Sequence, residues 1–132
     1  MGKPLTDAAE VLFRQIHPNF LHNGEPASDR FKPYPNDSGM MSVDRASLTT
    51  AAASHRLYTS NGFQSAAVFG VSVEEFGAEN VPCRDDPLAA TESTLANPAH
   101  ALADYNSHDD KKQKNISKRL KRKAVARGQL HP

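Results

Sequence analysis

The alternation of apolar and polar positions predicts short strands separated by long polar segments. Residues 11–17 and 66–73 have the composition of strands, and the second run is apolar enough to indicate burial on both faces. Two weaker strands are predicted over residues 40–44 and 99–105, although the latter segment is also compatible with a short helix. Pro18 marks the end of the first strand because it favours extended backbone at the residue before it.

Two helices are predicted from local signals. Residues 51–58 are rich in alanine, and Thr49 or Thr50 is expected to cap a helix there. Ser72 and Glu75 have the spacing of a capping box, which predicts a short helix directly after the second strand run.

A third helix is predicted over residues 111–127. Asp109 or Asp110 is its expected cap, and Gly128 is its expected stop. Its apolar positions form one narrow stripe: Ile116, Leu120 and Ala124.

Long loops separate these elements. Residues 18–39 contain four prolines and two glycines, and a loop of that length is expected to be either functional or poorly ordered. Residues 80–98 are predicted as a second loop because turn residues recur along them. With 132 residues, the chain has the length of one small domain. The pattern therefore predicts a small single α+β domain of about four short strands and about three helices.

Charge is distributed unevenly along the chain. The formal net charge is only +1, but residues 1–110 hold all 15 acidic residues and seven basic ones, whereas residues 111–132 hold nine basic residues and no acid. The chain thus divides into an acidic body, residues 1–110, and a basic C-terminal helix, residues 111–132, which we expect to belong to the same domain.

The basic segment is the strongest charge signal in the sequence. Its mutual repulsion would be relieved by docking on the acidic body or by an external polyanion. The sequence leaves open docking alone, docking combined with contact to nucleic acid, and binding to an acidic protein surface. Without aromatic residues for base stacking, contact with nucleic acid is expected to be nonspecific. The nine basic residues are Lys111, Lys112, Lys114, Lys118, Arg119, Lys121, Arg122, Lys123 and Arg127.

Composition excludes several classes of protein. No window approaches the ~20 apolar residues of a membrane span, and the start of the chain, which leads into Asp7 and Glu10, does not predict a secretory signal. The single cysteine, Cys83, excludes an internal disulfide and a cysteine-based zinc site, and it is expected to be a bystander thiol although Arg84 is adjacent. We expect no metal, no cofactor and no membrane partner. A small core is compatible with a homodimer.

Several sequence blocks are spread along nearly the whole chain: residues 12–18, 31–33, 41–43 with Asp37, 71–75, 86–87, 97–101 and 126–128. In these blocks the chain resembles a family of small bacterial proteins with no settled activity. The resemblance implies a bacterial cytoplasmic protein whose C-terminal helix belongs to the fold, and it supplies no chemistry. The chain departs from the pattern after Gly128, where residues 129–131 stand in place of an expected aromatic pair.

Arg14 is the first candidate for chemistry because it lies inside an apolar strand. A buried guanidinium is costly without a partner, so it must face an acid, a cleft or water. Two interpretations follow. Arg14 forms a salt bridge with an acid of the body, or it contacts a bound anion such as phosphate, whose geometry a guanidinium matches.

Two histidines and two small polar residues are further candidates. His17 and His100 lie at the ends of apolar segments, where loops converge, and are interpreted as hydrogen-bonding residues, as acid–base groups of one site or as metal ligands. A separation of 83 positions matches no metal-ligand motif. Ser42 has no Gly-x-Ser-x-Gly elbow around it, and Asp37 is expected to stabilise the glycine turn beside it.

Two hypotheses on function follow. The first is a small non-catalytic binding or regulatory protein whose basic C-terminal helix docks on the acidic body and contacts nucleic acid or an acidic partner. The alternative is a small transferase or hydrolase with a pocket around four residues: Arg14, His17, Ser42 and His100. A pocket lined by at least three of these side chains would favour the enzyme, and dispersed side chains would favour the binding protein.

The alternative is supported by a second resemblance. An arginine on an N-terminal strand, a later serine on a short strand and a long loop between them resemble the ADP-ribosyltransferase superfamily. The chain departs from that pattern because Glu74 and Glu75 begin a helix, and no glutamate stands in the catalytic place. Strand alternation also places Arg14 and His17 on opposite faces unless the strand ends before His17.

Overall fold

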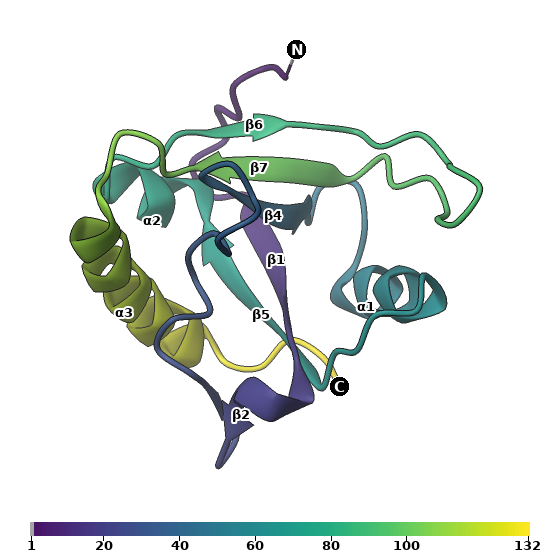
Figure 1. The fold of residues 1–132 in the computed structure, drawn as a ribbon, viewed down its shortest axis with the longest axis horizontal. Coiled ribbons are helices and arrows are strands. Elements are labelled where there is room, and N and C mark those ends of the chain that lie inside the picture. The colour runs from purple at the N-terminus through teal and green to yellow at the C-terminus, as the bar shows by residue number, and fades with distance from the viewer. Residues whose placement is uncertain (1) are drawn as a thin grey trace.

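A five-stranded antiparallel sheet forms the centre of the computed structural model, which describes residues 2–132 (Figure 1). The strands lie in the order β5-β1-β4-β7-β6. All four strands predicted from the sequence are present, and the prediction of a small α+β domain is confirmed. The strand bounds are β1 (Val11–Ile16), β4 (Met40–Arg45), β5 (Ala67–Ser72), β6 (Cys83–Asp85) and β7 (His100–Asp104).

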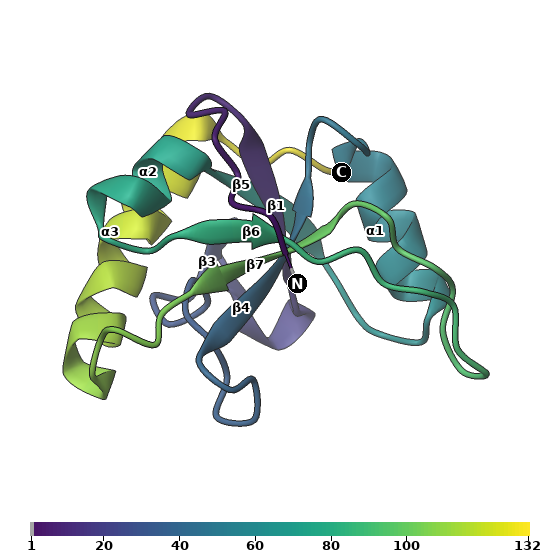
Figure 2. The ribbon, with the colours of Figure 1, turned by 90° about the horizontal axis from the view of Figure 1, so that it is seen from above.

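Helices lie on both sides of this sheet. α2 (Val73–Ala78) and α3 (Asp110–Arg127) lie on one side and α1 (Ala51–Ser60) on the other, as both views show (Figure 1, Figure 2). The hydrophobic core fills the space between the sheet and the pair α2 and α3. It is formed by alternate strand residues and by the inner faces of both helices, among them Leu12, Ile16, Met41, Phe69, Val71, Phe76, Ile116 and Leu120.

Each helix begins at a capping residue that the sequence indicated. Thr50 caps α1 and Asp109 caps α3, in both cases by accepting a hydrogen bond from a backbone amide three residues later. Both hydrogen bonds of the capping box between Ser72 and Glu75 are formed at the start of α2. Gly128 ends α3, where its φ of 99° is unfavourable for other residues.

The predicted loop over residues 80–98 contains one strand that the sequence did not reveal. Here β6 pairs with β7 at the edge of the sheet. A strand of three residues is too short to show an alternating pattern, so the loop prediction is wrong over residues 83–85.

The predicted loop over residues 18–39 contains regular structure in its first part, residues 18–26, and consists of turns and bends after that. A 3-10 turn (Pro18–Phe20) is followed by a small hairpin of β2 (Leu21–His22) and β3 (Glu25–Pro26). Asn23 and Gly24 connect its strands with φ values of 53° and 78°, the signature of the tight turn that Asn-Gly favours.

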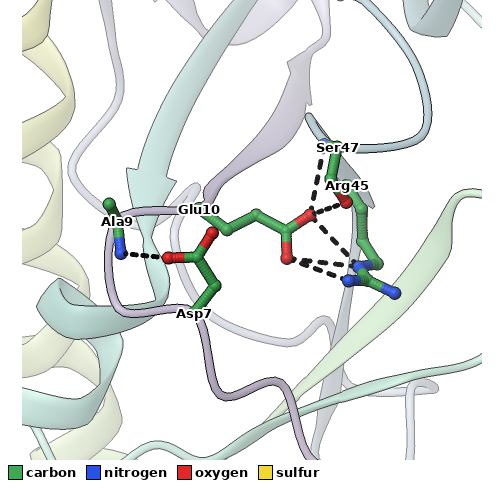
Figure 3. Close-up of polar contacts among 5 residues, drawn as sticks. All are labelled: Asp7, Ala9, Glu10, Arg45 and Ser47. Atoms are coloured by element: carbon green, nitrogen blue, oxygen red, sulfur yellow. Dashed lines mark hydrogen bonds and ion pairs between the residues drawn. The ribbon is translucent and has the colours of Figure 1, made fainter.

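A buried carboxylate joins the start of β1 to the end of β4 (Figure 3). Glu10 is 6% exposed and accepts hydrogen bonds from Arg45 Nη2 at 3.1 Å and from the Ser47 amide at 3.2 Å. Burial by itself raises the pKa of Glu10, but the hydrogen bonds from Arg45 and Ser47 outweigh it and lower this pKa below its ordinary value. Nearby, Asp7 accepts a hydrogen bond from the Ala9 amide. The ionised Glu10 therefore holds these two chain segments together.

The last residues of the chain cover the outer edge of β5. Leu130 donates a backbone hydrogen bond to Val68, and Val68 donates one to His131, each at 2.8 Å. Gly70 allows this approach, since a Cβ atom there would lie 2.5 Å from a methyl group of Val11 and 2.8 Å from one of Leu130. Residues beyond α3 thus form an isolated bridge with β5 and shield this edge of the sheet.

Candidate functional site

Arg14 lies where two central strands separate. β1 pairs with β5 at six positions but with β4 at two, Leu12 and Phe13. β4 nevertheless continues to pair with β7 from Met40 to Asp44. β1 and β4 therefore diverge after Phe13, and the Arg14 side chain bridges the opening in place of a backbone ladder.

The Arg14 guanidinium is buried without an acidic partner. The residue is 7% exposed. Its Nε donates to the carbonyl of Arg30 and its Nη1 to the carbonyl of Ser42, both at 3.0 Å. Its Nη2 has no hydrogen-bond partner, and no carboxylate of residues 2–132 lies within 4.0 Å of the group. The structure thus does not contain the salt bridge that was one interpretation of Arg14, and both N–H groups of Nη2 are left without a partner.

Arg14 is one of the residues that line a cavity of about 480 Å³, which we refer to as the Arg14 cavity, while its Nη2 atom is itself covered by protein atoms. The separation of β1 from β4 lets residues from both faces of β1 line it, Phe13 and Gln15 as well as Arg14. Three of the four candidates from the sequence, Arg14, Ser42 and His100, line the cavity. Its volume is typical of small-molecule sites, which measure about 300–1,000 Å³.

His17 lies outside the Arg14 cavity. β1 ends at Ile16, and the His17 ring accepts a hydrogen bond from the Asn19 amide at 3.0 Å, which caps the following 3-10 turn. The ring also meets Phe20 edge-on, with 6.0 Å between centroids. The sequence hypothesis is therefore corrected at His17, whose contacts are those of a local capping residue.

His100 forms a pair with an acidic residue that the sequence did not single out. Its Nδ1 lies 3.0 Å from both the Asp86 carboxylate and the Asp86 carbonyl. Because both neighbours are acceptors, Nδ1 carries the proton and Nε2 is the acceptor nitrogen of the neutral ring. Nε2 makes no hydrogen bond within residues 2–132. A histidine oriented in this way by a carboxylate can accept a proton from a bound molecule.

Ser42 contributes its backbone rather than its hydroxyl to the Arg14 contact. Ser42 lines the cavity, but its hydroxyl makes no hydrogen bond to His100 or to any other residue of the described chain. No serine–histidine pair is therefore assembled in this structure.

The long loop after β1 supplies an aromatic wall to the cavity. The Tyr34 ring centroid lies 4.9 Å from the Arg14 guanidinium and 5.0 Å from that of Arg30. Arg30 in turn lies 3.8 Å from the centroid of Phe20. Asp37 accepts a hydrogen bond from the Tyr34 amide at 2.9 Å, so its side chain stabilises the turn over residues 34–37 and not the glycine turn predicted for it. Of the two guanidinium groups beside the Tyr34 ring, Arg14 lines the cavity together with the acidic residues Asp37 and Asp44, whereas Arg30 is paired with Asp29.

A series of hydrogen bonds fixes the wall on the α1 side. Ser54 is 2% exposed and donates to Asp44 at 2.6 Å, while Gln15 donates to Ser54 at 2.9 Å. Asn97 donates to the second oxygen of Asp44 at 2.8 Å, and Ser65 donates to Gln15 at 2.7 Å. These polar side chains are thereby held in place before any ligand binds.

The basic helix α3 packs against the acidic body. Ile116, Leu120 and Ala124, the apolar stripe seen in the sequence, are at most 2% exposed. Three ion pairs join α3 to the body: Arg119 with Glu79 at 2.7 Å, Lys121 with Glu25 at 3.5 Å, and Arg127 with Glu75 at 2.8 Å.

Six basic side chains of α3 have no acidic partner within 4.0 Å among residues 2–132: Lys111, Lys112, Lys114, Lys118, Arg122 and Lys123. Four of them follow helical spacing on the side away from the core, namely Lys111, Lys114, Lys118 and Arg122. The last two also line a surface hollow of about 490 Å³.

Other chemistry receives little support. Cys83 is buried, and burial raises the pKa of its thiol to about 12, so the neighbouring arginine does not activate it. Within residues 2–132, no three potential ligand side chains gather as a metal site would require. Also within this range, no helix has both the length and the apolar character needed to cross a membrane.

Most residues around Arg14 were missed by sequence reasoning. Asp86 and Asn97 belong to the segment predicted as a plain loop, and Tyr34 belongs to the long loop after β1. Gln15 offered a signal, since it is a polar residue inside an apolar strand, as Arg14 is.

Comparisons with models of protein families, with curated proteins and with solved structures yield no match to this chain.

Proposed function

We propose that this chain is a small transferase or hydrolase that acts on an anionic small molecule bound in the Arg14 cavity. The observation that most supports the proposal is the buried Arg14 guanidinium, which lines the cavity and whose Nη2 has no hydrogen-bond partner in the described chain. Carbonyl groups compensate a buried charge less well than an anion does, so a phosphate or carboxylate would complete this environment.

In the proposed chemistry Arg14 and His100 have separate roles. Arg14 holds the anionic group of the substrate and stabilises negative charge that develops near it. Nε2 of His100 takes a proton from water or from an acceptor hydroxyl as that oxygen attacks the phosphorus or carbonyl carbon of the substrate. The bond to the leaving-group oxygen breaks, and this oxygen takes the proton back from the imidazolium. The Asp86 carboxylate accepts the hydrogen bond from Nδ1–H and stabilises the resulting imidazolium. Because Ser42 is not bonded to His100, the nucleophile in this proposal is water or the acceptor.

Binding of simple anions tests the first part of the proposal. Arg14→Lys retains the positive charge but loses the forked geometry, so we expect it to weaken binding of inorganic phosphate about tenfold. Arg56→Lys, on the exposed side of α1, is the matched control. Calorimetric titration of the full chain measures both, and equal phosphate affinity in wild type and both variants would contradict the proposal.

Turnover of p-nitrophenyl phosphate and p-nitrophenyl acetate tests the second part. We expect slow release of nitrophenol by the wild type and a loss of about 100-fold in His100→Gln, a typical contribution of an acid–base group. His22→Gln, an exposed histidine, controls for the substitution itself. Equal rates in the wild type and both variants would argue against catalysis by His100.

A second function, contact with nucleic acid, is supported by a different surface. The stripe of Lys111, Lys114, Lys118 and Arg122 is exposed, and no carboxylate of the described chain lies within 4.0 Å of its charged groups. The apolar side of α3 is buried in the core, so this stripe would contact phosphates and not bases.

The test of this second function uses substitution and not truncation, because α3 completes the core. Replacing the four stripe residues by Gln should reduce binding to labelled duplex DNA or RNA and flatten its salt dependence by about 3–4 in log–log slope. The matched control replaces Lys3, Lys32, Arg56 and Arg84 of the body by Gln. Unchanged binding in the stripe variant would exclude this surface.

A further inference from the structure

Exposed apolar side chains gather around the Arg14 cavity. Among residues 2–132, six large apolar side chains are at least 36% exposed. Four of these six line the cavity: Tyr34, Phe63, Leu88 and Leu95. They come from the loop before β4, the turn after α1 and the connection between β6 and β7. Exposed apolar area concentrated at one opening is typical of a ligand groove and not of chance exposure.

An aromatic pair forms part of this rim close to the guanidinium. Phe63 stacks on Tyr58 with 5.0 Å between ring centroids and 28° between planes, yet Phe63 is 53% exposed. Burial raises the pKa of Tyr58, Tyr34 adds to the rise and the positive charge of Arg14 opposes it. Tyr58, Phe63, Tyr34 and Arg14 therefore lie around the same space, and the exposed surface of the Phe63 ring remains available for stacking.

The rim is tied down before any ligand arrives. The Leu95 amide donates to the Asn61 side chain at 2.9 Å, which links the connection between β6 and β7 to the end of α1. Leu88 and Asn97 pair across that connection, and Asn97 also donates to Asp44. A rim that is already ordered loses little entropy when a ligand binds.

We propose that the ligand of the Arg14 cavity joins a planar ring to an anionic group. The ring packs against Phe63 and its apolar neighbours, while the phosphate or carboxylate meets the guanidinium side chain of Arg14. A cavity of about 480 Å³ is far larger than a simple anion needs. This inference rests on the proposed function and adds the apolar part of the substrate. A nucleotide would supply the ring with a phosphate, and an aromatic acid would supply it with a carboxylate.

Titration calorimetry on the full chain tests this inference by comparing the affinities of two compounds with those of their separate ring and anion fragments. The phosphate arm compares adenosine 5′-monophosphate with ribose 5-phosphate and adenosine. The carboxylate arm compares indole-3-acetate with acetate and indole. In one arm the joined compound should bind at least about tenfold more tightly than its ringless anion. The arm that shows this gain identifies the class of anion.

Variants of two exposed apolar residues locate the effect. Phe63→Ser should remove the gain from the ring and leave the affinity for the ringless anion unchanged. Leu48→Ser is the matched control, because Leu48 is 55% exposed and lies outside the cavity. Equal affinity of joined and ringless compounds in both arms, or an unchanged gain in Phe63→Ser, overturns the inference.

The outcomes separate this inference from the proposed function. If ringless anions bind through Arg14 but a ring adds nothing, the inference fails and the proposed function stands. If no anion binding depends on Arg14, the proposed function fails and the inference fails with it. A second copy of this chain could also occupy the apolar rim, and sedimentation of the wild type and of Phe63→Ser tests this. A wild-type dimer that dissociates in Phe63→Ser would show that a second copy covers the rim and would overturn the inference.

Discussion

The two faces of the central sheet differ in the side chains that cover them, apolar on one face and largely polar on the other. The face toward α2 and α3 is closed by apolar side chains such as Phe69, Phe76 and Leu120, none more than 2% exposed. The face toward α1 carries Gln15, Asp44 and other hydrogen-bonded polar groups, with a cavity between sheet and helix. The comparison indicates that stability is concentrated on one face, which leaves the other free to hold polar groups in positions suited to binding.

Arg14 belongs to both faces. By alternation it shares the core side of β1 with Leu12 and Ile16, yet it reaches the cavity because β1 and β4 separate beside it. A charge on the closed face is tolerable there only because carbonyl groups and the Tyr34 ring surround it.

Truncation of one leucine on each face is expected to give the largest difference in the free energy of unfolding. Leu120→Ala should lower the free energy of unfolding by about 3–4 kcal/mol, since it opens a cavity in the closed core. Leu95→Ala, on the open face and 56% exposed, should change it by no more than about 0.5 kcal/mol. Urea unfolding followed by circular dichroism measures both, and similar losses would contradict a division of labour between the faces.

Glu10→Gln tests the part of the β1–β4 contact where the two strands remain side by side, next to the start of β1. Removing the charge leaves Arg45 without its partner and should lower the free energy of unfolding by about 2 kcal/mol at pH 7. Because folding lowers the pKa of Glu10 below 4.5, the wild type gains this stability above its unfolded pKa and loses it as pH falls through the folded pKa.

The pH dependence supplies the control for this variant. The difference in unfolding free energy between wild type and Glu10→Gln should be full at pH 7 and should shrink as pH falls below about 4. A difference that stays constant down to pH 2 would show that packing and not ionisation of Glu10 is responsible.

Ser54→Ala tests whether the hydrogen-bonded polar side chains on the face toward α1 contribute to stability. It removes the donor to Asp44 and the acceptor of Gln15, and should lower the free energy of unfolding by about 1–2 kcal/mol. Ser60→Ala, exposed at the end of α1, serves as the control. A loss no larger than that of the control would mean that the polar wall contributes nothing to the fold.

Charge removal on the outside of α3 should have the smallest effect. Replacing Lys111, Lys114, Lys118 and Arg122 by Gln relieves repulsion and breaks no ion pair, so the free energy of unfolding should change by no more than about 0.5 kcal/mol. Urea unfolding at low and high salt measures the change. A loss above about 1 kcal/mol would place these residues among those that stabilise the domain.

Elements with long patterns or local end signals were predictable from the sequence. β5 is a continuous apolar run, and the caps of all three helices lie within four residues of the amides they bind. β6 was not predictable because three residues carry no period. Asn23-Gly24 was a readable hairpin signal inside a segment treated as irregular.

The site was predictable only in part, for a related reason. Arg14, Ser42 and His100 stood out from their own local contexts. Their partners did not, because the contacts of Arg14 with Arg30 and of His100 with Asp86 join segments 16 and 14 positions apart. His17 failed because the strand ends one residue earlier and the ring caps the next turn.

Arg14 can be observed directly by nuclear magnetic resonance of its guanidinium ¹⁵N–¹H groups while inorganic phosphate is added to the full chain. We predict that the Arg14 signals shift and saturate, at phosphate concentrations that leave those of the exposed Arg56 unchanged. Arg14 signals that do not move, or that move only in parallel with Arg56, would contradict an anion site at the Arg14 guanidinium.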